Sequence, residues 1–210
     1  MEQFEGLAIV VHGGAGGSSS QDDGCRAAAE SGMRAFAGGG DALDAVVAAV
    51  VVMENDPRFN AGTGAALGLD GKTAELDASV MDTRGRLGAV ACLQSVRNPV
   101  LVARDVADSP HCLLCGEGAL QFARLMGHSY HDCVTERARK ENSEVLQQLR
   151  EKGQVQKGVP NEDFARYWNY ASPRPMAGSI GCDTVGAVAR GPGNHFAVAG
   201  STGGSAPSLL

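Results

Sequence analysis

The chain has 210 residues, of which 43% are hydrophobic and 20% are charged, so it can bury one full core and is expected to form a single domain, 1–210. Its net charge of -6 disfavours a nucleic-acid or anionic-membrane partner, because phosphate binding is driven by clustered Lys and Arg. The longest apolar run, 42–53, is too short to span a bilayer, and the N-terminus lacks the basic region of a signal peptide. We therefore expect a cytoplasmic protein that acts on a small molecule.

The first predicted element is an apolar strand over 7–11, interpreted as an interior strand, which ends at His12 and a run of glycines. A glycine loop after a strand raises the possibility of a nucleotide site. The chain lacks both a Gly-Lys-Ser/Thr ending and a clear second strand with an acidic residue at dinucleotide-fold distance, which disfavours that site. His12 has two interpretations, a catalytic base or a hydrogen-bonded core residue that closes a buried strand.

Two helices are predicted next, followed by a polar loop. Asp22 or Asp23 can cap the first helix, which is expected to end at Ala37 before three glycines. Asp41 can cap the second helix, whose apolar residues recur at helical spacing. The loop over 54–64 leaves backbone carbonyls without strand or helix partners, so it suits either a hard cation or plain solvent contact.

The middle of the chain predicts antiparallel strands and further helices. An Asp-Gly turn at 70–71 indicates a hairpin between 65–69 and 72–81, and a third strand is expected over 87–93. Val145 and Leu146 are the few apolar anchors of the last, polar helix. The predicted helices cover 99–107, 117–126 and 135–152.

The cysteines leave two interpretations open. Cys112 and Cys115 have the spacing of a zinc-binding pair, with His111 beside them and His131 and Cys133 downstream. No second Cys-x-x-Cys pair supports a metal site. The favoured interpretation is that the first two cysteines act as small apolar residues in a buried segment that enters a helix.

The C-terminal part predicts a hairpin in which two threonines meet. Small apolar residues over 185–189 and 195–199 indicate strands buried on both sides, joined by a Gly-Pro-Gly-Asn turn. Pairing about this turn places Thr184 opposite Thr202. The preceding stretch, about 154–182, is rich in Pro, Gly and Asn and is interpreted as an exposed, mobile linker where a chain could be cut without unfolding its core.

Several short stretches occur in a recognisable order along nearly the whole chain. They are His-Gly-Gly-Ala-Gly at 12–16, Gly-Asp-Ala-Leu-Asp-Ala-Val at 40–46, Phe-Asn-Ala-Gly at 59–62, Glu-Leu-Asp-Ala-Ser-Val-Met-Asp at 75–82, Asn-Pro-Val at 98–100, Gly-Glu-Gly-Ala at 116–119, Asp-Thr-Val-Gly-Ala-Val at 183–188 and Ser-Thr-Gly-Gly at 201–204. With these stretches the sequence resembles the plant-type asparaginases and isoaspartyl aminopeptidases, which are threonine N-terminal-nucleophile hydrolases.

The resemblance implies an α+β fold, a four-layer αββα sandwich, made as a precursor that cleaves itself between Asp183 and Thr184. The part over 1–183 would then resemble the α-subunit, and 184–210 the start of the β-subunit. Thr184 would be the nucleophile, Thr202 the second active-site threonine and Asn60 a contact of the nucleophile. Gly203 and Gly204 would lie in the substrate-binding site. The implied substrates are L-asparagine and isoaspartyl dipeptides, with no cofactor for catalysis.

The resemblance also implies a structural sodium ion in the 54–64 loop and a homodimer of processed heterodimers. Backbone carbonyls would hold the ion, those of Met53, Glu54, Asp56, Phe59, Ala61 and Thr63.

The sequence departs from the family pattern near its end. The family's Arg and Asp that hold the substrate's carboxylate and amine, and its Thr-Gly-x-Gly oxyanion element, are expected after Ser-Thr-Gly-Gly, but the chain reaches Leu210 first. We therefore expect a fold that is incomplete at its C-terminus. Two alternatives stay open, a non-catalytic truncated sandwich module and a glycosylasparaginase- or taspase-like hydrolase, the latter suggested by Asp183.

Overall fold

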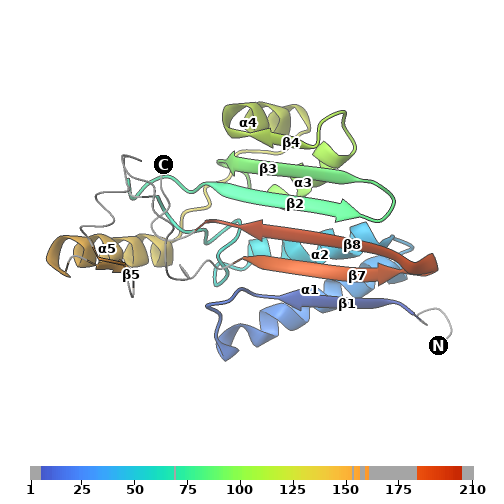
Figure 1. The fold of residues 1–210 in the computed structure, drawn as a ribbon, viewed down its shortest axis with the longest axis horizontal. Coiled ribbons are helices and arrows are strands. Elements are labelled where there is room, and N and C mark those ends of the chain that lie inside the picture. Colours follow the sequence, from blue (N-terminus) through green and yellow to red (C-terminus); the bar gives the residue numbers. More distant parts are fainter. Residues whose placement is uncertain (1–5, 69, 153, 157–158, 161–183, 205–210) are drawn as a thin grey trace.

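One six-stranded sheet organises the structure (Figure 1). The computed structural model describes residues 6–68, 70–152, 154–156, 159–160 and 184–204. The strand order is β1-β7-β8-β2-β3-β4, and every pair is antiparallel except β3 with β4. The strands are β1 (Ala8–His12), β2 (Leu76–Asp82), β3 (Leu87–Leu93), β4 (Leu113–Cys115), β7 (Val185–Gly191) and β8 (His195–Thr202).

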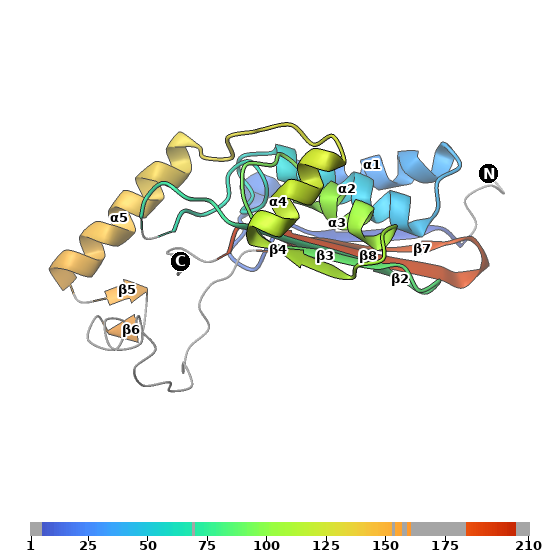
Figure 2. The ribbon, with the colours of Figure 1, turned by 90° about the horizontal axis from the view of Figure 1, so that it is seen from above.

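Four helices cover one face of this sheet, as Figure 2 shows. Here the helix-bearing side is called the covered face and the other side the helix-free face. A fifth helix, α5 (Glu136–Lys152), extends beyond the end of the sheet (Figure 1). The covering helices are α1 (Asp22–Ala37), α2 (Ala42–Asn55), α3 (Pro99–Ala107) and α4 (Gly116–Leu125). Two short 3-10 helices, Ser19–Gln21 and Pro192–Asn194, complete this part, and β5 (Gln154–Gln156) pairs with β6 (Val159–Pro160) in a separate small sheet.

The core lies between the sheet and helix α2. The cap of this helix is the predicted one, because the Asp41 carboxylate accepts the backbone N–H groups of Leu43 at 2.9 Å and of Asp44 at 3.1 Å. Two of its apolar residues, Val46 and Val50, are fully buried. The helix thus packs its apolar side on β7 and β8 and fixes the covered face of the hairpin.

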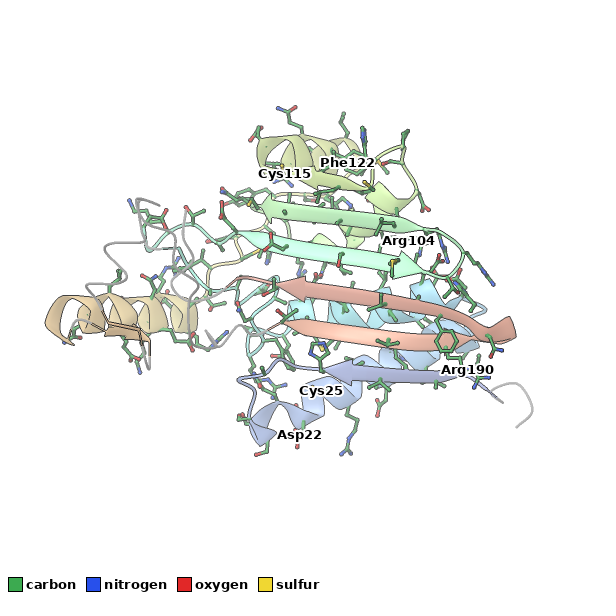
Figure 3. The ribbon with its side chains drawn as sticks, viewed as in Figure 1. Asp22, Cys25, Arg104, Cys115, Phe122 and Arg190 are labelled. Carbon is green, nitrogen blue, oxygen red and sulfur yellow. The ribbon has the colours of Figure 1, made fainter. Side chains whose placement is uncertain are left out.

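The β7–β8 hairpin is confirmed, but its predicted burial on both sides is wrong. Val185 and Ala187 are buried against the helices, whereas Val188 is 49% exposed. The two strands pair with β1 and β2, yet within the described residues nothing covers their second face. An alternating small apolar sequence is compatible with both arrangements. Figure 3 marks one end of this surface by Arg190, close to the β7–β8 turn.

Several local predictions need correction. The strand at the start of the chain is an edge strand rather than an interior one, and its Val10 is 71% exposed. The cap residue of α1 is Gln21 rather than Asp22 or Asp23, because a 3-10 turn precedes the helix. The hairpin expected before β2 is reduced to a tight turn, since Asp70 binds the N–H groups of Lys72 and Thr73 and the strand starts only at Leu76.

Two further expectations concern the edge of the fold. Cys115 is exposed on β4 beside α4 (Figure 3) and Cys112 is exposed before it, so this segment is not buried as predicted. Helix α5 is confirmed, but its buried residues include Ala138 and Asn142 rather than Leu146, which is half-buried. The predicted linker begins with β5 and β6, and most of it lies outside the described residues.

Candidate active site

The two threonines of the hairpin lie opposite each other. Val185 pairs with Ser201 at the open end of β7 and β8, so the next residue outward on each strand is Thr184 and Thr202. Such neighbours have Cβ atoms roughly 4.5–5.5 Å apart. Val185 and Ser201 are buried on the covered face, so alternation places both threonines, each half-buried, on the helix-free face. The register therefore agrees with the predicted placement of the two threonines, while the meeting of their hydroxyls stays a prediction.

Asn60 holds the two glycines that follow Thr202. Its side-chain amide donates to the Gly204 carbonyl at 2.5 Å, and its backbone carbonyl accepts the Gly203 N–H at 3.0 Å. A third bond, from the Ala66 N–H to Asn60 Oδ1 at 2.8 Å, fixes the orientation of the amide. The structure therefore brings Asn60 to the end of β8, one residue beyond Thr202.

The glycines are required by close packing rather than by free donors. A Cβ atom on Gly203 would lie 2.6 Å from Asn60 Oδ1 and from the Ala65 Cα. Gly204 has a φ of +75°, and its N–H donates to the Thr202 hydroxyl at 3.1 Å. Because both glycine N–H groups bind within the chain, their contribution to a substrate site would be space and shape.

Two further residues lie beside the threonines: Asp77, which sequence reasoning did not assign, and His12, which it left as either a catalytic base or a core residue. Asp77 lies opposite Thr202 on β2, and its carboxylate accepts the Cys92 N–H at 2.9 Å. His12 lies opposite Gly186, where a Cβ would come within 3.1 Å of the imidazole Cδ2, so the missing side chain makes room for the ring. His12 is exposed, so its interpretation as a core residue is wrong. The signal that could have found Asp77 was its position in the Glu-Leu-Asp-Ala-Ser stretch.

A buried carboxyl group, that of Glu54, lies behind the hairpin on the covered face. Its oxygens accept the Val100 N–H at 2.9 Å and the Asn98 amide at 3.1 Å. Burial raises the pKa of Glu54 to about 8, and nearby Ser201, Val100 and Asn98 oppose that rise only in part. The Ser201 hydroxyl lies close to the carboxyl group without meeting the geometry of a hydrogen bond. Glu54 therefore connects α2 to the start of α3, and its carboxyl group lies close to the strand residue next to Thr202.

The loop predicted to hold sodium folds back on itself. The carbonyl oxygens of Met53, Glu54 and Asp56 each accept one backbone N–H, at 3.2, 2.8 and 3.1 Å, which leaves each a second lone pair. A Cβ on Gly62 would meet the Glu54 carbonyl at 2.7 Å and the Arg97 carbonyl at 2.8 Å, so oxygens crowd this turn.

This crowding of oxygens fits a hard cation. The sodium site stays a prediction, with the ligand carbonyls of Met53, Glu54, Asp56, Phe59, Ala61 and Thr63.

The remaining candidates are the processing residue Asp183 and the proposed zinc ligands. Asp183 and its bond to Thr184 lie outside the described residues. The zinc hypothesis finds no support, because within the described residues no three His, Cys, Asp or Glu side chains are grouped to hold a metal ion. Cys133 is buried with its thiol directed at the Val96 carbonyl at 3.2 Å, and burial raises the pKa of this thiol to about 12. His131 instead contacts the Thr63 hydroxyl at 2.9 Å.

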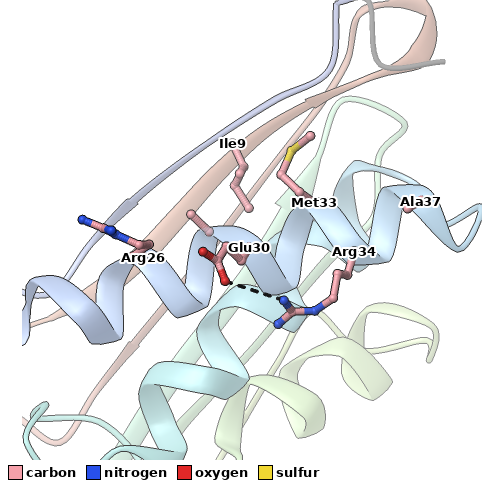
Figure 4. A pocket seen from close by; sticks show the side chains of 7 residues that line it. Ile9, Arg26, Glu30, Met33, Arg34 and Ala37 are labelled. Atoms are coloured by element: carbon pink, nitrogen blue, oxygen red, sulfur yellow. Dashed lines mark ion pairs between the residues drawn. The ribbon is translucent and has the colours of Figure 1, made fainter. Parts of the chain in front are cut away.

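A shallow hollow on the outer side of α1 contains none of these residues (Figure 4). It is lined by Ile9 of β1 and by helix residues that include Met33. An ion pair between Arg34 and Glu30, 3.8 Å long, lies at its side. The hollow is open and lies on the covered side, so it is not part of the threonine site.

Comparison with known proteins identifies the family of the chain. A family model described as Asparaginase matches residues 5–209. The chain belongs to this family. Within the described residues of this family member, no helix is long and apolar enough to cross a membrane.

The asparaginase-family chain is also similar to curated relatives. It is 42% identical to a plant-type L-asparaginase of Pyrococcus furiosus, over 94% of this chain and 63% of that protein. It is 38% identical to the mouse isoaspartyl peptidase/L-asparaginase, over 94% of this chain and 57% of that protein, and 39% identical to the human protein of the same name, over 93% and 60%. The chain thus spans less than two thirds of the length of these relatives.

Proposed function

We propose that the protein is an autoprocessing threonine amidohydrolase that cleaves L-asparagine or isoaspartyl dipeptides. The observation that carries this proposal is the pairing of Thr184 with Thr202 on the helix-free face, beside glycines held by Asn60. The names of the relatives, plant-type L-asparaginase and isoaspartyl peptidase/L-asparaginase, support the same substrates. They do not favour the glycosylasparaginase- or taspase-like alternative.

Maturation would free the nucleophile. The Thr184 hydroxyl attacks the Asp183 carbonyl, its proton passes to the leaving amine, and the acyl group moves from nitrogen to oxygen. Water then hydrolyses the resulting ester, which leaves an Asp183 carboxylate and a Thr184 with a free α-amine. An α-amine has a pKa of about 7.7–8.0, so near neutral pH it can act as the general base for the hydroxyl of the same residue.

The catalytic cycle would use the same atoms. The Thr184 α-amine takes the hydroxyl proton, Oγ attacks the side-chain amide carbonyl, and the proton passes to the departing ammonia or amino acid. Water cleaves the aspartyl ester and restores the hydroxyl. The Thr202 hydroxyl oxygen accepts a hydrogen bond from the Gly204 N–H, which fixes its orientation. Thr202 would in turn position the hydroxyl of Thr184, which lies opposite it.

The finer architecture also belongs to this proposal. An apolar row crosses the helix-free face in register, from Val10 through Val188 and Val198 to Met81 and Leu87, and all five are at least 39% exposed. We propose that a second sheet packs on this row to give the four-layer sandwich. A homodimer of processed heterodimers and a cytoplasmic location complete the proposal.

Mass spectrometry tests the central step. The chain should give two pieces that meet at the Asp183–Thr184 bond, and Thr184→Ala should abolish the cut together with ammonia release from L-asparagine. Ser79→Ala is the matched control, because Ser79 is an exposed hydroxyl residue of β2 on the helix-free face, the face that also carries Thr184. A chain that stays intact under maturing conditions, or a Thr184→Ala protein that is still cut, would contradict the proposal and favour the non-catalytic module.

A further inference from the structure

One guanidinium group binds the loop that carries Asn60 at two points, one on each side of that residue. Arg137, in the first turn of α5, donates from Nε to the Pro57 carbonyl at 3.0 Å and from Nη2 to the Gly64 carbonyl at 2.9 Å. Neither carbonyl belongs to the predicted sodium set. The loop therefore receives a fixed positive group from the helix, at carbonyls that the ion would not use.

The geometry of the loop explains why an arginine suits this position. Gly64 has a φ of +106°, and a Cβ there would lie 2.6 Å from the Pro57 carbonyl oxygen, so the two ends of the loop are in close contact. The planar guanidinium presents several N–H groups in a fixed fork, which lets one side chain reach both carbonyls. Glu141, one helical turn later, binds Arg137 Nη1 at 2.8 and 3.0 Å and holds the fork in place.

Neighbouring contacts attach the same segment to the core. The Gly64 N–H donates to the Cys133 carbonyl at 3.0 Å, and the Thr63 hydroxyl contacts His131 at 2.9 Å. The Cys133 thiol in turn lies 3.2 Å from the Val96 carbonyl. His131 and Cys133, just before α5, are thus anchored independently of Arg137, so the arginine acts on the loop from a fixed base.

Between the two fastened carbonyls lies Asn60, whose contacts lead to the site. Asn60 binds Gly203 and Gly204 through its backbone carbonyl and its side-chain amide, and the Gly204 N–H donates to the Thr202 hydroxyl. Every link from Arg137 to this threonine is a hydrogen bond or a short covalent segment. We propose that Arg137 is a positioning residue of the active site, which holds Asn60 and, through it, the glycine turn next to Thr202.

This inference rests on the proposed function for its catalytic consequence, but its structural part can be tested alone. Amide hydrogen exchange by NMR can follow the N–H of Gly203 and the N–H of Ala66, since both donate to Asn60. In Arg137→Gln, both amides should exchange about tenfold faster or more, because the loop opens locally. The Val188 amide, in the paired part of β7, should keep its protection.

Arg139→Gln is the matched control. Arg139 lies on the same helix, and its guanidinium pairs with Glu136 at 2.5 Å through exposed side chains. This variant should leave the Gly203 and Ala66 amides unchanged. Millimolar guanidinium ion should restore part of their protection in Arg137→Ala but not in a chain destabilised elsewhere. Equal acceleration of Gly203, Ala66 and Val188 in Arg137→Gln would overturn the proposal in favour of a general structural role, and so would no acceleration at all.

Steady-state kinetics of the Arg137 variants test the effect of this residue on catalysis. Arg137→Gln should lower kcat at least tenfold with a smaller change in KM, because the nucleophile loses its orientation while the chain stays folded. Arg137→Lys should recover only part of the loss, since an ammonium does not reproduce the fork. If the unaltered protein neither cleaves itself nor releases ammonia, the proposed function fails while the exchange data still decide the role in the loop. Loss of protection at Gly203 with unchanged kcat would overturn the positioning role.

Discussion

The two ends of the β7–β8 hairpin each lie beside a buried carboxyl group, and the two groups behave in opposite ways. At the open end, burial raises the pKa of Glu54 to about 8. At the turn end, burial also raises the pKa of Asp82, but hydrogen bonds from the backbone and side chain of Arg86, from His195 and from the Arg84 N–H outweigh it and lower the pKa to about 2.

The difference lies in the donors rather than in the burial. Asp82 accepts a charged guanidinium at 2.6 Å and the His195 Nε2 at 3.0 Å, in addition to two backbone N–H groups. Arg86 also pairs with Asp41, the cap of α2, so ion pairs connect the turn end of the hairpin to this helix. The donors that Glu54 receives from the described part of the chain, the Val100 N–H and the Asn98 amide, are neutral. The turn end is built for rigidity, whereas the threonine end keeps a neutral acid beside the strand that carries Thr202.

The largest expected effect is the pH dependence that Glu54 imposes. The folded chain keeps this group protonated up to about pH 8, whereas in the unfolded chain it ionises near its ordinary value of 4.5. The folded state therefore binds the extra proton between these values, and stability should fall by roughly 3–5 kcal/mol as the pH rises from 5 to 9. Urea unfolding at constant sodium concentration measures this, and Glu54→Gln should flatten the slope. A slope that persists in Glu54→Gln would assign it to another group.

The next effect comes from removing the acid at the turn end. Asp82→Ala leaves the buried His195 without its carboxylate and removes one carboxylate partner from Arg86, so the free energy of unfolding should fall by about 3 kcal/mol. Asp108→Ala is the control, because Asp108 forms an exposed pair with Arg104 and its loss should have no measurable effect. Equal unfolding midpoints in urea for Asp82→Ala and the control would show that the network is not stabilising.

Much of the hairpin could be predicted from the sequence, since its determinants are local. The Gly-Pro-Gly-Asn turn and the small apolar alternation fix the register, and register alone brings Thr184 opposite Thr202. The Asp41 cap is equally local. Burial of the second face depends on what else packs there, which alternation does not encode, and so the prediction of a strand buried on both sides was wrong.

The surroundings of the threonines depended on distant contacts. Glu54 binds Asn98 and Val100, which are 44 and 46 residues away, and nothing near Glu54 in the sequence distinguishes it from a solvated residue at a helix end. Asn60 reaches Gly204 across 144 residues, and only the family resemblance indicated it. Arg137 shows the same limit, because a polar helix gives no signal of which arginine turns toward a loop.

A smaller effect is expected at acidic pH from the turn end. The pKa of Asp82 is lower in the folded chain than in the unfolded chain, so its stabilising contribution is complete above about pH 4. It should be lost as the pH falls toward 2, at a cost of about 2 kcal/mol. Asp82→Asn should remove this part of the acid limb and leave the Glu54 slope between pH 5 and 9 intact. If one substitution alters both limbs, the two ends are coupled rather than independent.

The smallest effect distinguishes the unpartnered polar atoms at the two ends. Within the described residues, Ser201 Oγ at the threonine end and His195 Nδ1 at the turn end are buried without a hydrogen-bond partner. Ser201→Ala removes an unsatisfied hydroxyl, so stability at pH 6 should change by less than about 1 kcal/mol. Because Ser201 lowers the pKa of Glu54, the same substitution should move the midpoint of the alkaline slope to higher pH. Thermal unfolding across pH 6–9 measures both quantities, and an unchanged midpoint would show that the hydroxyl does not act on the carboxyl group.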